Sequence, residues 1–172
     1  MSSTVVHFVQ VDGQFQDLEL RNSWGLAAMV WSALCDRYRV QAPGPFEDWN
    51  RLWKLVADKA IILQPWEHNV LHFTYDNAVL RRQDFAQMAK DMRMFQQQRA
   101  KSEQVCHLVA VADVLEREAT NEKFEFACLW ATSVTDDPWV VYIEGEDEES
   151  EGEYKNYDFK VGDRHWFIEM RT

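Results

Sequence analysis

The sequence predicts an α+β fold with an N-terminal β-hairpin, about four helices and a C-terminal antiparallel β-meander packed against the helices. Strand-like patterns cluster at the two ends of the chain, whereas apolar residues at three- and four-residue steps fill the middle. Because strands and helices cluster instead of alternating, parallel βαβ units are disfavoured. The chain has 172 residues, 47% of them hydrophobic, so we expect one domain over 1–172 with an acidic flexible loop at 144–153.

The first expected element is a β-hairpin. Residues 4–11 contain four valines, and β-branched residues favour strands. Asp12-Gly13 follows, and this dipeptide is typical of the short turns whose backbone matches the twist of paired strands. Residues 14–20 then alternate imperfectly between apolar and polar positions, which predicts the second strand.

Two helices are expected next. Apolar residues recur at helical spacing from about 23 to 39, after Asn22-Ser23, which can cap a helix. The segment 41–45 contains two prolines and breaks the pattern, and Pro45 suits the first turn of a second helix. The two apolar stripes consist of Trp24, Ala28, Trp31, Leu34, Cys35 and Tyr38, and of Phe46, Trp49, Leu52, Trp53 and Val56.

The centre of the chain predicts a strand and two more helices. Residues 69–74 are expected to form the strand, and Asp76 or Asn77 to cap a long helix over about 78–100. A fourth helix capped by Ser102 is preferred because its apolar stripe persists to Leu115. The valine content of 105–111 leaves a strand there as the alternative.

The last third predicts the meander. Residues 123–132 alternate partly, and 139–143 follow a turn at Asp136-Asp137-Pro138. The segments 154–161 and 165–171 flank Gly162-Asp163, so we expect them to pair as a closing hairpin.

Acidic residues are concentrated between Glu144 and Glu153. This stretch holds seven acidic and no basic residues, and without them the formal net charge falls from −11 to −4. A solvated hairpin loop, a surface for a basic partner, and a weak cation site are three interpretations of it. For a partner surface, the predicted contact residues are Glu146, Asp147, Glu148 and Glu149, with Trp139 nearby at the start of a strand.

His68 and His72 are four residues apart, a spacing that places two imidazoles on one face of a helix where they can hold zinc. The segment 70–74 is strand-like, however, and residues four apart on a strand are separated by about 13 Å. The order also differs from the His-Glu-x-x-His pattern of metalloproteases. The sequence therefore predicts no metal site here.

The remaining residues predict no catalytic site and no cofactor. Cys35, Cys106 and Cys128 are odd in number and unpaired in any motif, so buried, reduced thiols in the cytoplasm are expected. The six glycines form no phosphate-binding loop. Residues 81–101 carry a local net charge of +4, and Arg81, Arg82 and Arg93 are candidates for binding an anionic ligand.

These observations favour a non-enzymatic, cytoplasmic protein–protein interaction module, of inhibitor, immunity or phage-encoded antagonist type. The partner is expected to be a protein with a basic surface, and a homodimer is a further option. The alternative is a small-molecule or nucleotide-binding domain, with or without enzymatic activity, that uses an aromatic pocket and those arginines. The acidity disfavours binding to a nucleic-acid backbone, and no apolar run reaches the ~20 residues that cross a membrane.

Overall fold

The computed structural model describes residues 3–21, 26–41, 45–99, 107–131, 136–145 and 151–172. In this part of the chain there are five α-helices and seven β-strands. The strands form a five-stranded sheet in the order β2-β1-β4-β3-β7 and a separate two-stranded ribbon of β5 and β6. The predicted α+β class is confirmed.

The N-terminal hairpin forms as predicted from β1 (Ser3–Gln10) and β2 (Phe15–Arg21), which pair in antiparallel fashion. Gly13 has a φ of 82°, a left-handed conformation that costs glycine little. The backbone N–H of Gln10 donates to the Gln14 carbonyl at 2.8 Å and closes the turn. The other edge of β1 pairs with β4 (Phe124–Ala131), so β1 lies inside the sheet.

Four helices occur where the apolar stripes predict them. They are α1 (Leu26–Tyr38), α2 (Pro45–Ala57), α4 (Phe85–Arg99) and α5 (Leu108–Glu118). The helix expected near 105–115 is therefore confirmed from Leu108 onward, whereas its proposed cap Ser102 and the cap Asn22-Ser23 lie outside the described residues. No helix in the described ranges has both the length and the apolar character needed to cross a membrane.

A further helix, α3 (Pro65–Phe73), replaces the strand predicted over 69–74, and that prediction was wrong. Pro65 occupies the first turn, where its missing N–H costs no hydrogen bond. The side chain of Glu67 reaches back and accepts a hydrogen bond from the backbone N–H of Gln64 at 2.9 Å. These interactions at the helix start favour a helix, although the composition of the following residues 70–74 is typical of a strand.

The long helix predicted from about 78 begins later, because β3 (Ala78–Arg81) and a short 3₁₀ turn (Arg82–Asp84) precede α4. Three of the four residues of β3 are buried, so the strand shows no alternation between apolar and polar positions. Such a continuous apolar run cannot be distinguished from the start of a buried helix by periodicity.

The C-terminal strands pair differently from the expected closing hairpin. β5 (Val140–Ile143) and β6 (Glu153–Asn156) form the antiparallel ribbon. β7 (Trp166–Phe167) instead runs parallel to β3, where the N–H of Trp166 donates to the Asn77 carbonyl at 3.0 Å. The segment 165–171, which was predicted to pair with 154–161, therefore pairs with the free edge of β3 instead.

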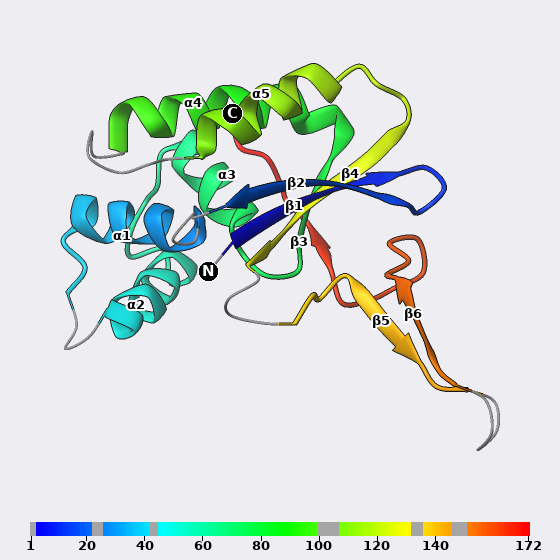
Figure 1. The fold of residues 1–172 in the computed structure, drawn as a ribbon. Helices are drawn as coiled ribbons and strands as arrows, with labels where there is room; N and C mark the ends of the chain where they lie inside the picture. The colour runs from blue at the N-terminus through cyan, green and yellow to red at the C-terminus, as the bar shows by residue number, and fades with distance from the viewer. Residues whose placement is uncertain (1–2, 22–25, 42–44, 100–106, 132–135, 146–150) are drawn as a thin grey trace.

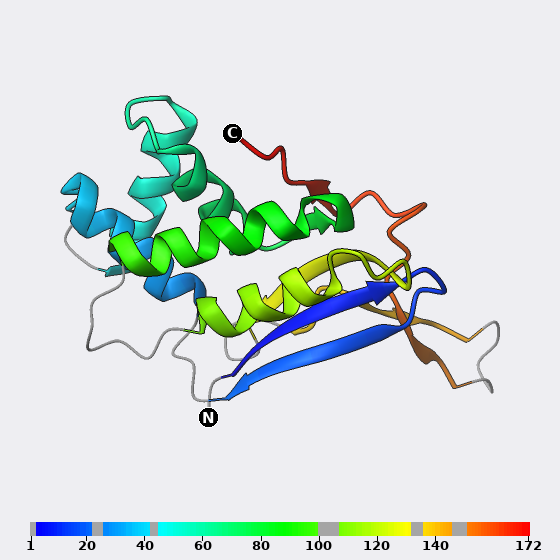
Figure 2. The ribbon, with the colours of Figure 1, turned by 90° about the horizontal axis from the view of Figure 1, so that it is seen from above.

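The five-stranded sheet separates two apolar clusters. One face carries Val6, Phe8 and Leu80, which pack with the five helices in the main core. Figures 1 and 2 show α4 and α5 lying side by side over this face. The opposite face carries Val9, Val79 and Cys128 and is covered by the C-terminal segment. The large buried side chains on that side are Trp139, Tyr157 and Phe159.

Candidate functional sites

The ribbon of β5 and β6 projects away from the sheet and the helices (Figure 1). Tyr142 and Tyr154 face each other across it, with ring centroids 5.0 Å apart. These side chains are 52% and 75% exposed, and neighbouring Ile143 is exposed as well. The ribbon therefore presents an apolar and aromatic surface that no other described part of the chain covers.

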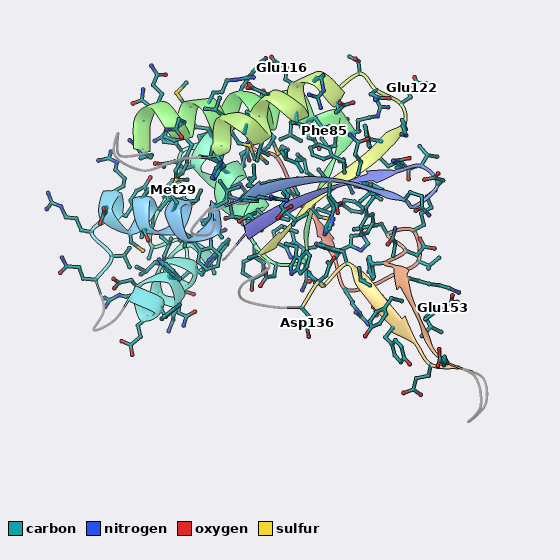
Figure 3. The ribbon with its side chains drawn as sticks, in the orientation of Figure 1. Met29, Phe85, Glu116, Glu122, Asp136 and Glu153 are labelled. Carbon is teal, nitrogen blue, oxygen red and sulfur yellow. The ribbon has the colours of Figure 1, made fainter. Side chains whose placement is uncertain are left out.

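Acidic side chains continue this surface toward the end of the ribbon. Glu144, Glu151 and Glu153 are exposed, and Figure 3 shows Glu153 on the projecting strand. The predicted partner-binding residues Glu146, Asp147, Glu148 and Glu149 lie outside the described residues. Their contact with a partner stays a prediction.

Trp139, the fifth predicted contact residue, occupies the core at the base of the ribbon. Its side chain is only 1% exposed, and its indole N–H donates to the Leu129 carbonyl at 3.1 Å. The ring stacks on Phe159 with centroids 5.2 Å apart, and the Tyr157 N–H donates to the Trp139 carbonyl at 2.7 Å. Trp139 therefore anchors the ribbon to the sheet and offers no surface to a partner in this conformation.

His7 lies beside this anchor and is almost completely buried. Its Nδ1 lies 2.8 Å from Oδ1 of Asp17, and its Nε2 lies 3.3 Å from Oδ2 of Asp137, an ionic contact without the alignment of a hydrogen bond. Burial alone lowers the pKa of His7, but Asp137 and Asp17 outweigh it and raise the pKa above its ordinary value of 6.5. The imidazole of His7 thus connects β2 to the turn that begins the ribbon.

The three candidate anion-binding arginines do not converge. Arg93 forms ion pairs of 2.8 Å with both Asp113 and Glu116 on α5. The guanidinium of Arg81 lies over the Phe167 ring at 3.8 Å from its centroid. Arg82 donates to a backbone carbonyl of the α5 C-terminus at 3.3 Å.

Arg81 and Arg82 do line one shallow depression of about 300 Å³, but Glu122 and Glu125 line it too. The two carboxylates oppose an anion there, because like charges repel in a partly desolvated site. Arg81 and Arg82 therefore do not make this depression favourable for an anion.

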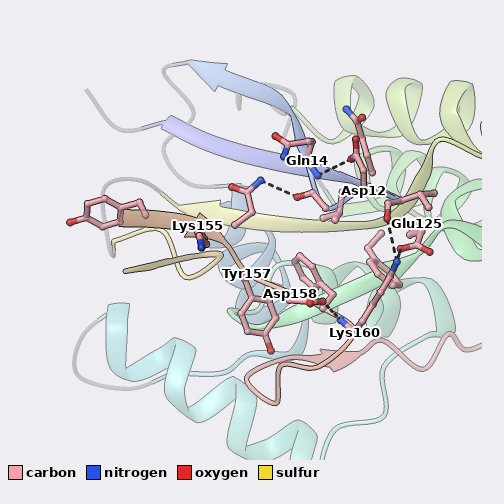
Figure 4. Close-up of a pocket in the computed structure, with 15 residues that line it drawn as sticks. Asp12, Gln14, Glu125, Lys155, Tyr157, Asp158 and Lys160 are labelled. Carbon is pink, nitrogen blue, oxygen red and sulfur yellow. Dashed lines mark hydrogen bonds and ion pairs between the residues drawn. The ribbon is translucent and has the colours of Figure 1, made fainter. Parts of the chain in front are cut away.

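A larger groove of about 510 Å³ lies between the turn of the β1–β2 hairpin and the segment that follows β6 (Figure 4). Hydrogen bonds cross it, since Asn156 donates to the Gly13 carbonyl at 3.0 Å and Lys160 to the Val11 carbonyl at 3.2 Å. Lys160 also lies 3.5 Å from Glu125. These polar groups hold the C-terminal segment to the hairpin, and the groove contains no histidine, cysteine or serine that would serve as a nucleophile or base.

On α3, the histidines assigned to separate positions on a strand lie together on one helical face. The rings of His68 and His72 stack with centroids 3.8 Å apart and planes inclined by 27°. Burial, with a contribution from His72, lowers the pKa of His68 to about 4, and burial also lowers the pKa of His72. Both imidazoles are therefore neutral at physiological pH. No group of three or more His, Cys, Asp or Glu side chains in the described ranges has the arrangement of a metal site.

The histidine pair opens into two adjoining depressions that share His72 and Trp166. One, of about 410 Å³, also contains Glu169 and Arg171. The other, of about 460 Å³, is bounded by aromatic rings, with Trp53 and Tyr75 packed edge to face at 4.7 Å. We call the two depressions together the histidine–aromatic groove.

The cysteines provide no reactive centre in the described residues. Cys35 and Cys128 are free and buried. Burial raises the pKa of the Cys35 thiol to about 11 and that of Cys128 well above its ordinary range, so both are protonated at neutral pH. Cys106 lies outside the described residues.

The groove was not predicted, because the strand expected over 69–74 would place His68 and His72 apart, whereas α3 brings them onto one face. The Gln64-Pro65-x-Glu67 pattern is the helix-start signal that would have placed both histidines on one face. Trp166 and Tyr75 had no comparable local signal, because they join the groove through the pairing of β7 with β3. Comparison of the chain with family models, curated proteins and solved structures found no match.

Proposed function

We propose that this protein is a non-enzymatic interaction module, of the kind that inhibitors, immunity proteins and phage-encoded antagonists represent, and that it binds a basic partner protein through the β5–β6 ribbon. One observation carries the proposal. The ribbon projects from the body of the protein (Figure 1), and it exposes Tyr142 and Tyr154 on the same two strands as the exposed Glu153 (Figure 3).

The tyrosine pair is the part of the ribbon suited to provide affinity. Tyrosine is enriched in protein interfaces and among the residues that dominate binding energy, because it buries a large ring at a low cost in side-chain entropy. On an isolated two-stranded ribbon, exposed rings gain little from the protein's own core. Covering Tyr142, Ile143 and Tyr154 with a partner would remove that apolar surface from water.

The acidic residues are suited to select and attract the partner. The sequence holds seven acidic residues between 144 and 153, and such a cluster of like charges creates a strong negative potential. Such a patch accelerates encounter with a basic surface, and salt weakens this effect because it screens exposed charges. A basic protein is therefore the expected partner, and nucleic acid is not.

The described cysteines are free thiols, which agrees with a reducing compartment such as the cytoplasm. A second copy of the chain is a less favoured partner, because the basic stretch 81–101 uses Arg93 and Arg99 in intramolecular ion pairs.

A small anionic ligand on Arg81 and Arg82 remains the alternative. It is less favoured because Glu122 and Glu125 line the same depression.

The proposal is tested by affinity capture of tagged protein from its native cell extract at low salt, followed by calorimetry with each purified candidate. The ribbon variant carries Tyr142→Ser and Tyr154→Ser. A matched control carries Met94→Ser and Val109→Ser, which remove two similarly exposed apolar side chains from α4 and α5. We expect a stoichiometric partner with wild type and control, at least about tenfold weaker binding with the ribbon variant, and further weakening by salt.

The same partner bound with equal affinity by all three proteins would remove the ribbon from the binding surface. Absence of any partner would contradict the interaction-module proposal. In that case a metabolite screen with Arg81→Gln as the comparison variant would test the small-molecule alternative.

A further inference from the structure

Two imidazoles on α3 lie close enough to share one ligand, and this site is independent of the ribbon. The ring centroids of His68 and His72 are 3.8 Å apart. A transition metal ion at about 2.0–2.1 Å from each of two nitrogens bridges nitrogens up to roughly 4.2 Å apart. That span is measured between nitrogens, and these two rings are stacked with planes inclined by 27°, so both must turn about their side-chain bonds before Nε2 of each can point at one ion.

The hydrogen bond made by His72 fixes its tautomer. Its Nδ1 lies 2.8 Å from the carbonyl oxygen of His68. A carbonyl only accepts, so the proton of the neutral imidazole resides on Nδ1. Nε2 of His72 therefore carries a free electron pair, which is the form of imidazole that binds a metal ion.

The tautomer of His68 follows from the orientation of Asn69. The Asn69 Nδ2 group donates to Asp91 at 2.7 Å and to the Arg171 carbonyl at 2.9 Å, and its Oδ1 accepts from the Arg171 N–H at 2.9 Å. These three contacts identify Oδ1 as the acceptor that faces Nδ1 of His68, at 3.4 Å. The proton of His68 therefore also resides on Nδ1, and its Nε2 carries the free pair.

We infer that His68 and His72 form a two-histidine site for a divalent transition metal ion, Zn²⁺, Cu²⁺ or Ni²⁺. Within the described residues, neither Nε2 has a hydrogen-bond partner, although the Nδ1 of each ring has one. An outer hydrogen bond that orients the ring and leaves the other nitrogen for the metal is the usual arrangement of a metal-binding histidine.

The surroundings determine what kind of metal site this is. Two protein ligands leave the other coordination positions to water or to a ligand in the histidine–aromatic groove, so the site is open and weaker than a four-ligand structural zinc site. Glu169 and Arg171 line the same depression and carry opposite charges. Arg171 opposes a cation, which further limits the affinity, whereas Trp166 and the other rings restrict access to one side.

Calorimetric titration of the full chain with Zn²⁺ tests the inference, using the variants His68→Gln and His72→Gln. Loss of an outer partner of a metal ligand weakens binding by about 10–100-fold, so loss of a ligand should weaken it at least about tenfold. His165→Gln is the matched control, because this half-buried histidine bonds Tyr157 and packs on Phe159, which both belong to the apolar cluster on the other face of the sheet. We expect one Zn²⁺ per chain in wild type and control.

Paramagnetic Cu²⁺ locates the site in the unaltered protein and does not depend on any variant folding. Substoichiometric Cu²⁺ should selectively broaden the amide resonances of 67–73 and 166–171. Broadening confined to the acidic residues 144–153, or equal Zn²⁺ affinity in all four proteins, would overturn the inference. Absence of Zn²⁺ and Cu²⁺ binding to the wild-type chain would overturn it as well.

Discussion

Nδ1 of His7 lies 2.8 Å from Oδ1 of Asp17, and both residues sit at paired positions of β1 and β2. His7 is buried with its ring near Trp130 and Phe15, and Cys128 is its paired residue on β4. The only other charged group within ion-pair distance among the described residues is Asp137, at 3.3 Å. The imidazole is therefore held between two carboxylates that come from different parts of the chain.

This arrangement makes stability depend on pH. The pKa of His7 is raised in the folded protein, so its stabilising effect is complete below its ordinary value of 6.5 and is lost as pH rises through the folded pKa. We expect the free energy of unfolding, measured with urea between about pH 6 and pH 8, to fall more steeply in wild type than in Asp17→Asn. Glu19→Gln, on the same strand, should retain the wild-type slope, and equal slopes in all three proteins would contradict the ion pair.

Trp139 is expected to stabilise the folded protein and not to contact a partner protein directly. Trp139→Ala removes a fully buried indole and leaves the Leu129 carbonyl without its donor. The expected loss is about 3–5 kcal/mol in the free energy of unfolding, measured by urea denaturation. Tyr154→Ala, which truncates an exposed ring, should change stability by no more than about 0.5 kcal/mol. A similarly small effect at Trp139 would show that the ribbon base is not packed as described.

Glu67 and Arg99 form a buried ion pair of 2.6 Å, in which Glu67 has no solvent exposure. Arg99→Leu leaves a buried carboxylate without its counter-charge, so we expect a loss of about 3–5 kcal/mol. The double variant Glu67→Leu and Arg99→Leu should lose less than the sum of the two single variants, because it removes both charges together. Strict additivity in this cycle would argue that the two side chains do not interact.

Asn69 should control the protection of the C-terminal segment. Its side chain donates to the Arg171 carbonyl and accepts from the Arg171 N–H, both at 2.9 Å, as a neighbouring strand would. Asn69→Ala is expected to accelerate hydrogen exchange at the Arg171 amide and to cost about 1–3 kcal/mol, since Asp91 also loses a donor.

Asn156→Ala is the control for that experiment, because Asn156 is exposed and bonds a different part of the chain. It should leave exchange at Arg171 unchanged. Unchanged exchange in Asn69→Ala as well would mean that the tail is held by β7 alone.

Local patterns predicted the elements whose information lies within them. The valine-rich segment with Asp12-Gly13 predicts the first hairpin because the turn and both strands are contiguous. The helical spacing of apolar residues likewise predicts the position of α1, although of the predicted stripe only Leu34 and Cys35 are buried and the other buried residues are Leu26 and Val30. β3 was missed because a four-residue strand buried on both faces has no period to detect.

The candidate sites depend on contacts between distant segments, which one sequence does not encode locally. Trp139 looked like an exposed strand residue beside an acidic loop, and only its packing on Tyr157 and Phe159 reveals its role in the core. The histidine pair required the correct helix at α3, and its aromatic walls required Trp166 to be brought there by β7. The exposure of Tyr142 and Tyr154 likewise depends on the direction in which the ribbon leaves the sheet.

The parallel pairing of β7 with β3 constrains the order of events during synthesis. The backbone of β3 finds its second neighbour only when Trp166 is available, 85 positions after Arg81. At about 5–20 residues per second, a nascent chain keeps this edge open for roughly 4–17 s. During that interval the hydrogen-bonding groups of Ala78–Arg81 are a template for strands of other chains. Ribosome-associated chaperones are thus expected to matter more for this protein than its small size implies.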